Sequence, residues 1–165
     1  MSTTLHSKQA VLAEMGQHPA VAALTADLAE AFLDARRDRD ELTLTLDPQQ
    51  IVAAGQSLKR AGYNFLEDVT AVDWFPATAP RFQVSYHLLS HRHKERIRLR
   101  VLLPGDHPSV PTITSVWPSA NYYEREVFDL FGITFEAHPN MRRILMPDDW
   151  IGHPLRRDYP VEGYR

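Results

Sequence analysis

Prolines recur at near-even intervals through the C-terminal part of the chain, at Pro139, Pro147, Pro154 and Pro160. Proline lacks a backbone N–H donor and moves the preceding residue out of the helical region, so a helix cannot run through these positions. We therefore predict that residues 133–165, called the C-terminal segment below, are extended. The segment also carries large apolar side chains, which usually need a surface to lie on. The sequence thus predicts an extended Pro/Arg-rich interaction segment.

Composition limits the rest of the chain and its chemistry. A chain of 165 residues with 44% apolar content can bury one core, so we expect one globular domain, with N-terminal helices, over residues 1–132. The absence of cysteine excludes thiolate-bound iron–sulfur clusters and cysteine nucleophiles. No apolar run approaches the roughly 20 residues of a membrane span, and the start lacks the features of a signal peptide, so we expect a soluble, intracellular protein. The net charge of −3 gives no general reason to expect nucleic acid as a ligand.

The spacing of apolar residues predicts both helices and strands. The expected elements are helices over 8–15 and 20–35, a strand over 42–46, a helix over 48–61 that is capped by Asp47 and stopped by Gly62, strands over 65–74, 81–89 and 96–103, a loop over 104–118 with one short strand near 112–116, and a helix from 121 to Gly132. The second and third of the long strands form an antiparallel hairpin. We therefore expect an α+β fold with a mixed four-stranded sheet, helices packed on one face and an extended C-terminal ribbon.

The helix predicted from Asn121 carries a dense set of charges. Asn121 and Glu124 have the spacing of a capping box, in which the acid returns to the first backbone N–H of the helix. Two interpretations of Arg125, Glu126 and Asp129 remain open. They form the solvated side of an ordinary amphipathic helix, or they hold the arginines of the C-terminal segment through charge-assisted pairs.

The C-terminal segment has four arginines of its own: Arg142, Arg143, Arg156 and Arg157. A planar guanidinium suits bidentate recognition of carboxylates, and arginine among apolar anchors is typical of protein interfaces. The alternative is that these arginines are solvated. Asp148 and Asp149, which precede Trp150, could pair with them or cap a short turn.

The histidines give little support to a metal site. His87, His91 and His93 cluster in sequence, but no pair has the helical spacing of a zinc site together with a third ligand. His138 and His153 each precede proline, which favours a role in fixing extended backbone or in a local hydrogen bond.

The strand with Arg96, Arg98 and Arg100 presents three cations on one face of the sheet. Recognition of single-stranded nucleic acid favours aromatic side chains on the same face, whereas Phe82 and Tyr86 are expected on the opposite one. No glycine-rich phosphate-binding loop is present, so nucleotide and dinucleotide binding have no support.

Residues 124–160 resemble very closely the signature of one family, the thirty-kilodalton or C subunit of the proton-pumping NADH:quinone oxidoreductase, respiratory complex I. The matching residues are Glu124, Arg125, Glu126, Asp129, Phe131, Gly132, Phe135, His138, Pro139, Arg142, Arg143, Ile144, Leu145, Pro147, Asp149, Trp150, Gly152, Pro154, Leu155, Arg156, Asp158, Tyr159 and Pro160. Residues 66–74 and 117–123 also resemble this family, so the resemblance covers roughly residues 42–160. Ala137 stands where glycine is expected, and Arg157 replaces the usual lysine.

The resemblance implies a structural component of the peripheral arm that binds no cofactor and lies against the quinone-site (D) subunit. FMN, iron–sulfur clusters, NADH and quinone would be bound by partner subunits. The chain would be held at the cytoplasmic side of the bacterial inner membrane only through the complex. The residues expected at partner interfaces or in structural roles are Glu124, Arg125, Glu126, Asp129, His138, Arg142, Arg143, Asp149, Trp150, His153, Arg156, Arg157, Asp158 and Tyr159.

Three alternatives remain at this point. A related membrane-bound hydrogenase, or another electron-donor dehydrogenase, could use an equivalent subunit. A stand-alone RNA-binding module could use the arginine strand, in which case binding should depend strongly on salt. A His/Asp metal hydrolase should contain stoichiometric metal.

Overall fold

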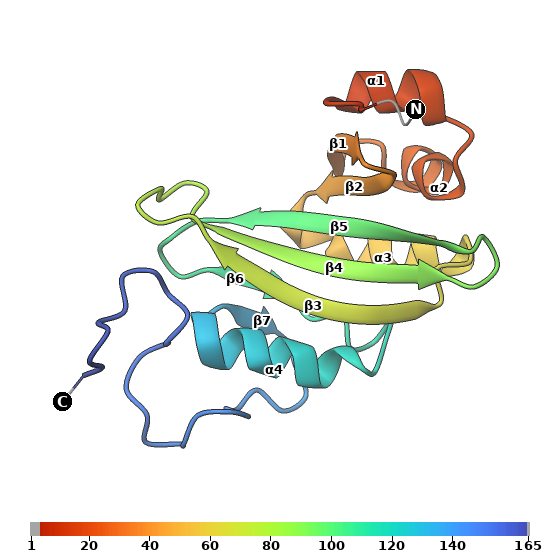
Figure 1. Ribbon diagram of the computed structural model, residues 1–165. Helices are drawn as coiled ribbons and strands as arrows, with labels where there is room; N and C mark the ends of the chain where they lie inside the picture. Colours follow the sequence, from red (N-terminus) through yellow and green to blue (C-terminus); the bar gives the residue numbers. More distant parts are fainter. Residues whose placement is uncertain (1–3, 165) are drawn as a thin grey trace.

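The computed structural model describes residues 4–164. Its main element is a five-stranded mixed sheet with the strand order β1-β2-β5-β4-β3 (Figure 1). The strands are β1 Phe32–Asp38, β2 Glu41–Leu46, β3 Phe65–Asp73, β4 Phe82–Ser90 and β5 Glu95–Leu103. β2 and β5 pair in parallel, and all other neighbours are antiparallel. The predicted α+β class and the β4–β5 hairpin are confirmed, with five strands in the sheet instead of four.

Helices cover one face of this sheet and leave the other open (Figure 1). They are α1 Lys8–Met15, α2 Pro19–Leu28, α3 Ile51–Arg60 and α4 Ala120–Phe131, with a 3₁₀ turn, η1 Pro48–Gln50, before α3. α4 packs against β3, α2 against α3, and α1 against β1 at the sheet edge. Alternate residues of β4 and β5, among them Tyr86 and Leu99, are buried under the helices, and the residues between them face the open side.

The helix predicted over residues 20–35 is wrong in its second half. α2 ends at Leu28, and β1 begins at Phe32 and pairs with β2. Arg39 and Asp40 join the two strands with positive φ values of 50° and 67°, the conformation that a two-residue hairpin turn requires. Because the hairpin buries Phe32 in the core, tertiary packing overrides the helical spacing of this stretch.

The helix predicted to follow Asp47 is confirmed. The Asp47 carboxylate accepts a hydrogen bond from the Gln49 N–H at 2.9 Å, and Gly62 follows the helix with a φ of 109°. The crossover that contains this helix joins β2 to β3, which run in the same direction but are separated by β5 and β4.

A second, two-stranded sheet joins the globular domain to the C-terminal segment. β6 Ser109–Pro111 and β7 Thr134–Glu136 pair in parallel, so the short strand predicted near 112–116 lies slightly earlier in the chain. Ile133 and Phe135, which the sequence placed in the extended segment, are buried in the core. The globular domain therefore includes residues 133–136. Residues 137–164 contain no helix or strand, but hydrogen-bonded turns recur in them, such as Pro147 O with the Trp150 N–H and His153 O with the Arg156 N–H, so this part is less extended than predicted.

Candidate partner-binding surface

The carboxylate of Asp129, in the last turn of α4, organises the first part of the C-terminal segment. Its side chain is fully buried. Oδ2 accepts hydrogen bonds from the backbone N–H groups of Ile144, Leu145 and Met146 at 3.0, 2.8 and 2.9 Å. Oδ1 accepts from Arg143 Nη1 at 2.6 Å. Burial alone would raise the pKa of Asp129, but these donors hold it below its ordinary value.

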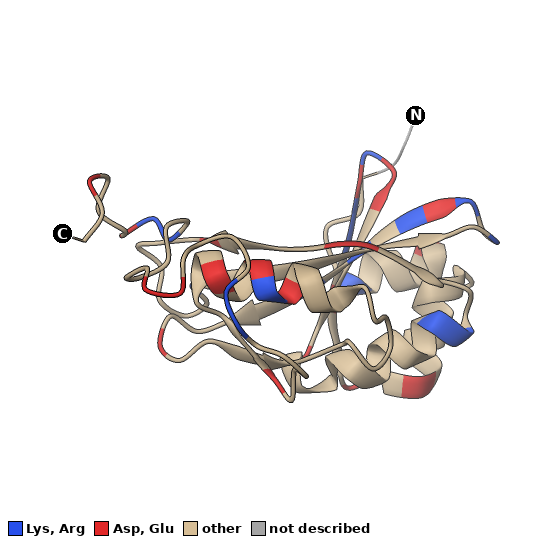
Figure 2. Ribbon diagram, turned by 90° about the horizontal axis from the view of Figure 1, so that it is seen from below, with Lys and Arg blue, Asp and Glu red and all other residues tan. Residues whose placement is uncertain are grey.

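Arg143 extends this network along the segment. Its Nη2 donates to the carbonyl oxygens of Trp150 and Gly152, both at 3.0 Å. Arg125, one turn earlier on α4, donates to the carbonyls of Arg142 and Arg143 at 3.1 and 3.0 Å. Figure 2 shows the charged bands of α4 with a basic stretch of the C-terminal segment running beside the helix.

The three charges that the sequence grouped on α4 therefore have different roles. Asp129 forms an ion pair with an arginine of the segment, as in the second of the two interpretations. Arg125 holds the segment through backbone carbonyls and not through a carboxylate. Glu126 is exposed and makes no hydrogen bond or ion pair within residues 4–164, as in the first interpretation.

The carbonyl oxygens at the C-terminal end of α4 accept hydrogen bonds from residues far along the chain. The three bonds are Asp129 O with His153 Nδ1 at 2.9 Å, Leu130 O with the Leu155 N–H at 3.0 Å, and Phe131 O with Arg156 Nε at 2.6 Å. Helix ends leave such carbonyls without partners, so the segment completes the helix. Gly132 permits this approach, because a Cβ at its φ of 70° would lie 2.5 Å from the His153 ring.

A second buried ion pair holds the far end of the segment. Arg81 Nε and Nη2 donate to the two carboxylate oxygens of Asp73 at 2.9 and 2.8 Å, and Nη2 also donates to Asp158 at 2.7 Å. The Arg157 N–H donates to Asp73 at 2.9 Å. Burial would raise the pKa of Asp73, but the bonds from Arg81 and from the Arg157 and Phe75 N–H groups lower it to about 2.

The predicted capping box of α4 is wrong. The helix begins at Ala120 after Ser119, and Glu124 is fully buried on the side that faces the loop after β6. Its carboxylate accepts from the Ile113 N–H at 2.8 Å and from the Thr112 hydroxyl. Packing thus uses this acid to join α4 to the loop and not to cap the helix.

His138, near the start of the segment, contacts α4 beside Glu124. His138 Nε2 lies 3.2 Å from Asn121 O and 3.8 Å from a Glu124 carboxylate oxygen. Burial raises the pKa of Glu124 to about 7, against the opposing effect of its two donors. Burial also lowers the pKa of His138. The histidine therefore serves as a hydrogen-bond donor to the helix, as its position before Pro139 indicated.

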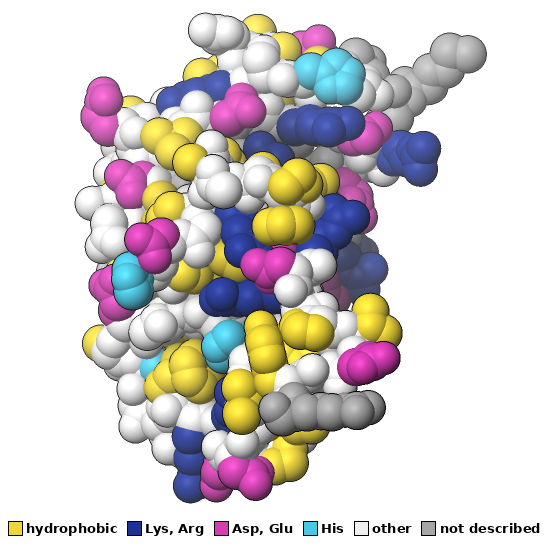
Figure 3. All heavy atoms as spheres, turned by 90° about the vertical axis from the view of Figure 1, so that its left-hand side faces the viewer, with side chains coloured by type: hydrophobic (Ala, Val, Ile, Leu, Met, Phe, Trp, Pro, Cys, Tyr) yellow, Lys and Arg dark blue, Asp and Glu magenta, His cyan; other side chains and the backbone are white. Residues whose placement is uncertain are grey.

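The apolar side chains of residues 137–164 face mostly outward. Their exposed members are Ile144, Leu145, Trp150, Ile151, Leu155, Val161 and Tyr164, with exposed fractions from 37% to 105%. Figure 3 looks onto this end of the molecule and shows hydrophobic side chains gathered on its lower half. Asp149 and Tyr159, which the sequence also placed at a partner interface, belong to this part of the segment. Asp149 is exposed, and the Tyr159 hydroxyl donates to Ile151 O at 3.2 Å. Hydrogen bonds and ion pairs therefore hold the segment on the globular domain, and its exposed apolar side chains are free to contact a partner.

Sequence reasoning did not find Asp73, Arg81 or Thr112. A signal for Asp73 was present, because it continues the inward alternation of Val69 and Ala71 on β3. An acid at an inward position needs a cationic or hydrogen-bonding partner. Its partners could not be found from local spacing, since Arg157 lies 84 residues away in the chain.

Other kinds of site have little support in the described part of the chain. Residues 4–164 contain no group of three His, Asp or Glu side chains placed to hold a metal ion. Among the same residues no helix is long and apolar enough to cross a membrane. Phe82 and Tyr86 are buried under the helices, so they cannot stack nucleic-acid bases on the open arginine face.

Comparison with known proteins decides which family carries this arrangement. The model of the family described as "Respiratory-chain NADH dehydrogenase, 30 Kd subunit" matches residues 44–165. The chain belongs to this family. The 30 Kd subunit match includes α3, the whole of α4 and the C-terminal segment, and so contains every residue of the candidate surface.

Curated relatives in the 30 Kd subunit family are similar over most of their length. The C subunit of NADH-quinone oxidoreductase from Geobacter sulfurreducens is 47% identical over 145 residues, which cover 87% of this chain and 90% of the relative. The protein of the same name from Roseiflexus castenholzii is 46% identical over 144 residues, 86% of this chain and 82% of the relative. The chain is therefore similar to these C subunits over most of its own length and of theirs.

Two solved structures share the fold. A trypsin-resistant fragment (1-134) of Nqo5 aligns with a TM-score of 0.64 and 34% identity, over 74% of this chain and 98% of the fragment. A chain of the membrane-bound sulfane sulfur reductase, an archaeal respiratory membrane complex, aligns with a TM-score of 0.76 and 24% identity, over 90% of this chain and 87% of that chain. At that identity the second likeness shows the fold alone.

Proposed function

We propose that this chain is the structural, cofactor-free C subunit of a proton-translocating NADH:quinone oxidoreductase, and that its C-terminal segment docks on the quinone-site (D) subunit. The observation that carries the proposal is the arrangement of residues 137–164. Buried charges fasten the backbone to α4 and β3, while seven large apolar side chains of the segment stay exposed. Such a preformed apolar surface loses little conformational entropy on binding.

The role of the chain in electron transfer is indirect. It has no cysteine to hold iron–sulfur clusters, and no glycine-rich loop for FMN or NADH. We assign FMN, the clusters, NADH and quinone to partner subunits, and expect the isolated chain to have no activity. The chain would then hold the quinone-site subunit and the other peripheral-arm subunits in position, at the cytoplasmic side of the bacterial inner membrane.

A second candidate is the equivalent subunit of a related hydrogenase or another electron-donor dehydrogenase. The shared fold with a chain of the sulfane sulfur reductase supports keeping it. The curated relatives at 46–47% identity favour the NADH enzyme, because they are named as its C subunit. Genes for flavin-binding and NADH-binding subunits beside this gene would favour the NADH enzyme, and nickel–iron hydrogenase genes would favour the alternative.

The docking proposal is tested by placing charge on the exposed apolar surface. In cells that assemble the complex, Ile151→Asp and Leu155→Asp should reduce the amount of intact complex on a native gel, because a buried unpaired carboxylate disfavours association. Leu33→Asp is the matched control, since Leu33 on β1 is exposed to a similar degree, 54% against 51% for Leu155.

Three outcomes of this experiment are informative. Loss of assembly with the segment variants, together with normal assembly of the control, supports docking through residues 137–164. The quinone-site subunit should then be the polypeptide that cross-links to residue 151. Normal assembly of Ile151→Asp and Leu155→Asp, or equal loss with Leu33→Asp, would refute this docking surface.

A further inference from the structure

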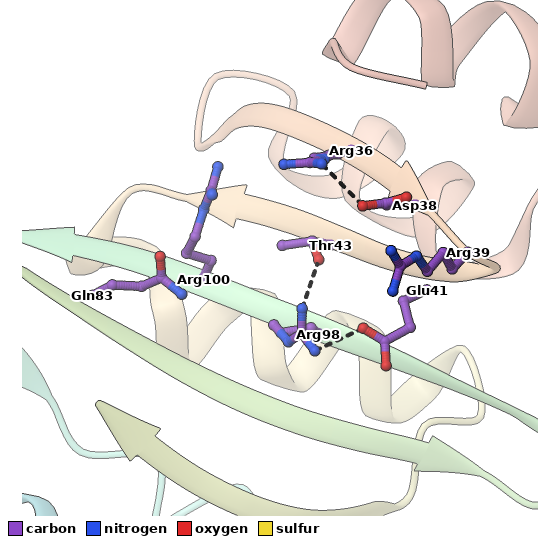
Figure 4. Close-up of a pocket in the computed structure, with 8 residues that line it drawn as sticks. All are labelled: Arg36, Asp38, Arg39, Glu41, Thr43, Gln83, Arg98 and Arg100. Atoms are coloured by element: carbon purple, nitrogen blue, oxygen red, sulfur yellow. Dashed lines mark hydrogen bonds and ion pairs between the residues drawn. The ribbon is translucent and has the colours of Figure 1, made fainter. Parts of the chain in front are cut away.

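The open face of the sheet carries a hollow that the C-terminal segment does not line. Its volume is about 380 Å³, and its lining residues come from β1, β2, β4, β5 and the turn between β1 and β2. Figure 4 shows the charged side chains of this hollow projecting from the same side of neighbouring strands. α3 and α4 lie on the opposite face, and no residue of a helix lines the hollow.

The hollow has a local charge opposite to that of the whole chain. Its charged lining residues are four cations and two anions: Arg36, Arg39, Arg98, Arg100, Asp38 and Glu41. The lining therefore has an excess of two positive charges, whereas the chain has a formal net charge of −3. A local reversal of sign of this kind attracts acidic ligands and steers their approach.

The arginines of the hollow differ in how their donors are used. Arg98 is held by the chain, through His87 at 3.0 Å and Glu41 at 2.8 Å. Arg100 donates both Nε and Nη2 to Thr45, at 3.0 and 2.7 Å, and its Nη2 also lies 4.0 Å from the Asp34 carboxylate. Its Nη1 has no acceptor within residues 4–164.

The remaining two arginines add unused donors at the mouth of the hollow. The guanidinium of Arg36 donates through Nη2 to Asp38 at 3.0 Å, and its other N–H groups have no acceptor in the described part of the chain. Arg39 makes no hydrogen bond or ion pair there. The hollow thus contains guanidinium groups that the chain holds in a fixed orientation. It also contains N–H donors that have no acceptor among the described residues.

We propose that this hollow is a second docking surface, which receives an acidic, Asp/Glu-bearing segment of another protein chain in the assembly. The free fork of an arginine matches a carboxylate in a bidentate arrangement. An excess of two positive charges suits a ligand that brings a few carboxylates better than the many charges of a continuous phosphate backbone. No aromatic side chain lines the hollow, so nucleic-acid bases have nothing to stack on.

This inference is independent of docking through the C-terminal segment. The residues of the hollow belong to β1, β2, β4, β5 and one turn, and none lies beyond residue 100. A complex that assembles through another surface could still use the hollow, and failure of the hollow would leave the segment unaffected.

Binding of the purified full chain to a short fluorescein-labelled polyglutamate peptide tests the charge argument. We expect fluorescence anisotropy to report binding at low salt, and expect Arg36→Glu with Arg100→Glu to weaken it at least about tenfold. The matched control is Arg92→Glu with Lys94→Glu, the same charge change in the exposed β4–β5 turn. It should bind nearly as the unmodified chain does. If circular dichroism shows that the Arg36→Glu, Arg100→Glu variant is unfolded, the variant Arg36→Gln with Arg100→Gln replaces it.

The assembled complex gives a second, independent readout. A photo-crosslinking amino acid in place of Gln83, which lines the hollow, should form a cross-link in the purified complex to a stretch rich in Asp and Glu of another subunit. Equal loss of peptide binding in the control variant, no peptide binding at all, or a cross-link to a basic or apolar stretch would overturn the proposal. Tighter binding of a single-stranded oligonucleotide or of phosphatidylglycerol vesicles would also overturn it, in favour of a phosphate ligand.

Discussion

Asp129 and Arg143, 14 residues apart in the chain, form a 2.6 Å ion pair that fixes the C-terminal segment on α4. The same carboxylate also binds three consecutive backbone N–H groups, so one buried side chain determines the conformation of residues 143–146. This arrangement differs from a solvated helix face, because the Asp129 carboxylate points inward and is bound by donors of the same chain.

Replacing Asp129 by Asn should loosen this part of the segment. The amide has one oxygen fewer to accept with and no charge, so the loss should be about 2 kcal/mol of local stability. Hydrogen exchange measured by mass spectrometry should show faster exchange over residues 143–146. Glu126→Gln, an exposed position on the same helix, should leave the exchange rates unchanged. Unchanged exchange in Asp129→Asn would contradict the role assigned to this carboxylate.

Truncation should separate the globular domain from residues 137–164. A chain that ends at residue 136 keeps Ile133, Phe135 and β7, and we expect it to unfold cooperatively. A chain that ends at residue 132 loses these core side chains. The single substitution Phe135→Ala should by itself cost about 3–5 kcal/mol. Thermal unfolding followed by circular dichroism checks all three chains, and equal stability of the two truncated chains would place the boundary at residue 132.

The raised pKa of Glu124 predicts a stability that falls as pH rises. Its folded-state pKa is about 7, against an ordinary value of 4.5, so between these values the folded state binds more protons than the unfolded state. The favourable contribution is complete below about pH 4.5 and is lost as pH rises through 7. The full change amounts to about 3 kcal/mol.

The pH dependence is measured as the difference between the unmodified chain and Glu124→Gln. Urea unfolding from about pH 5 to about pH 8 should show the free energy of unfolding of the unmodified chain decreasing relative to the variant. The comparison cancels other titrating groups, although His138 at 3.8 Å calls for a repeat in a His138→Gln background. Parallel curves for the two chains would disprove the raised pKa.

Ala137 has a φ of 60°, a conformation that costs a residue with a Cβ free energy relative to glycine. Glycine is also the residue that the family resemblance led us to expect here. We therefore predict that Ala137→Gly stabilises the chain by about 1 kcal/mol. A rise in the midpoint of urea unfolding checks this, and a fall would show that the Cβ makes a favourable contact that outweighs the backbone strain.

Local patterns predicted the elements whose physics is local. The alternation in β4 and β5 follows from one buried and one open face, and the caps at Asp47 and Gly62 satisfy the ends of a single helix. β1 was mistaken for helix because Phe32 fits the spacing of α2 as well as it fits a hairpin. Only packing against β2 separates the two possibilities.

The candidate surface could be predicted only in part, because its contacts are long-range. The sequence showed that the segment is rich in arginine and apolar residues, but it did not show which side chains bind the globular domain and which face outward. Arg156 binds a helix carbonyl 25 residues away, and Asp158 binds Arg81 across 77 residues. The buried place of Glu124 was missed for the same reason, since its partner Thr112 precedes the helix in an irregular loop.

The last turn of α4 has its carbonyl oxygens bonded to residues 153, 155 and 156, so the helix end and the tail cannot melt separately. Force that a bound neighbour applies to the C-terminal segment would be transmitted directly to α4 and to the sheet beneath it. Anything that peels the tail away would also unwind the helix terminus, which makes detachment a cooperative step and not a gradual fraying.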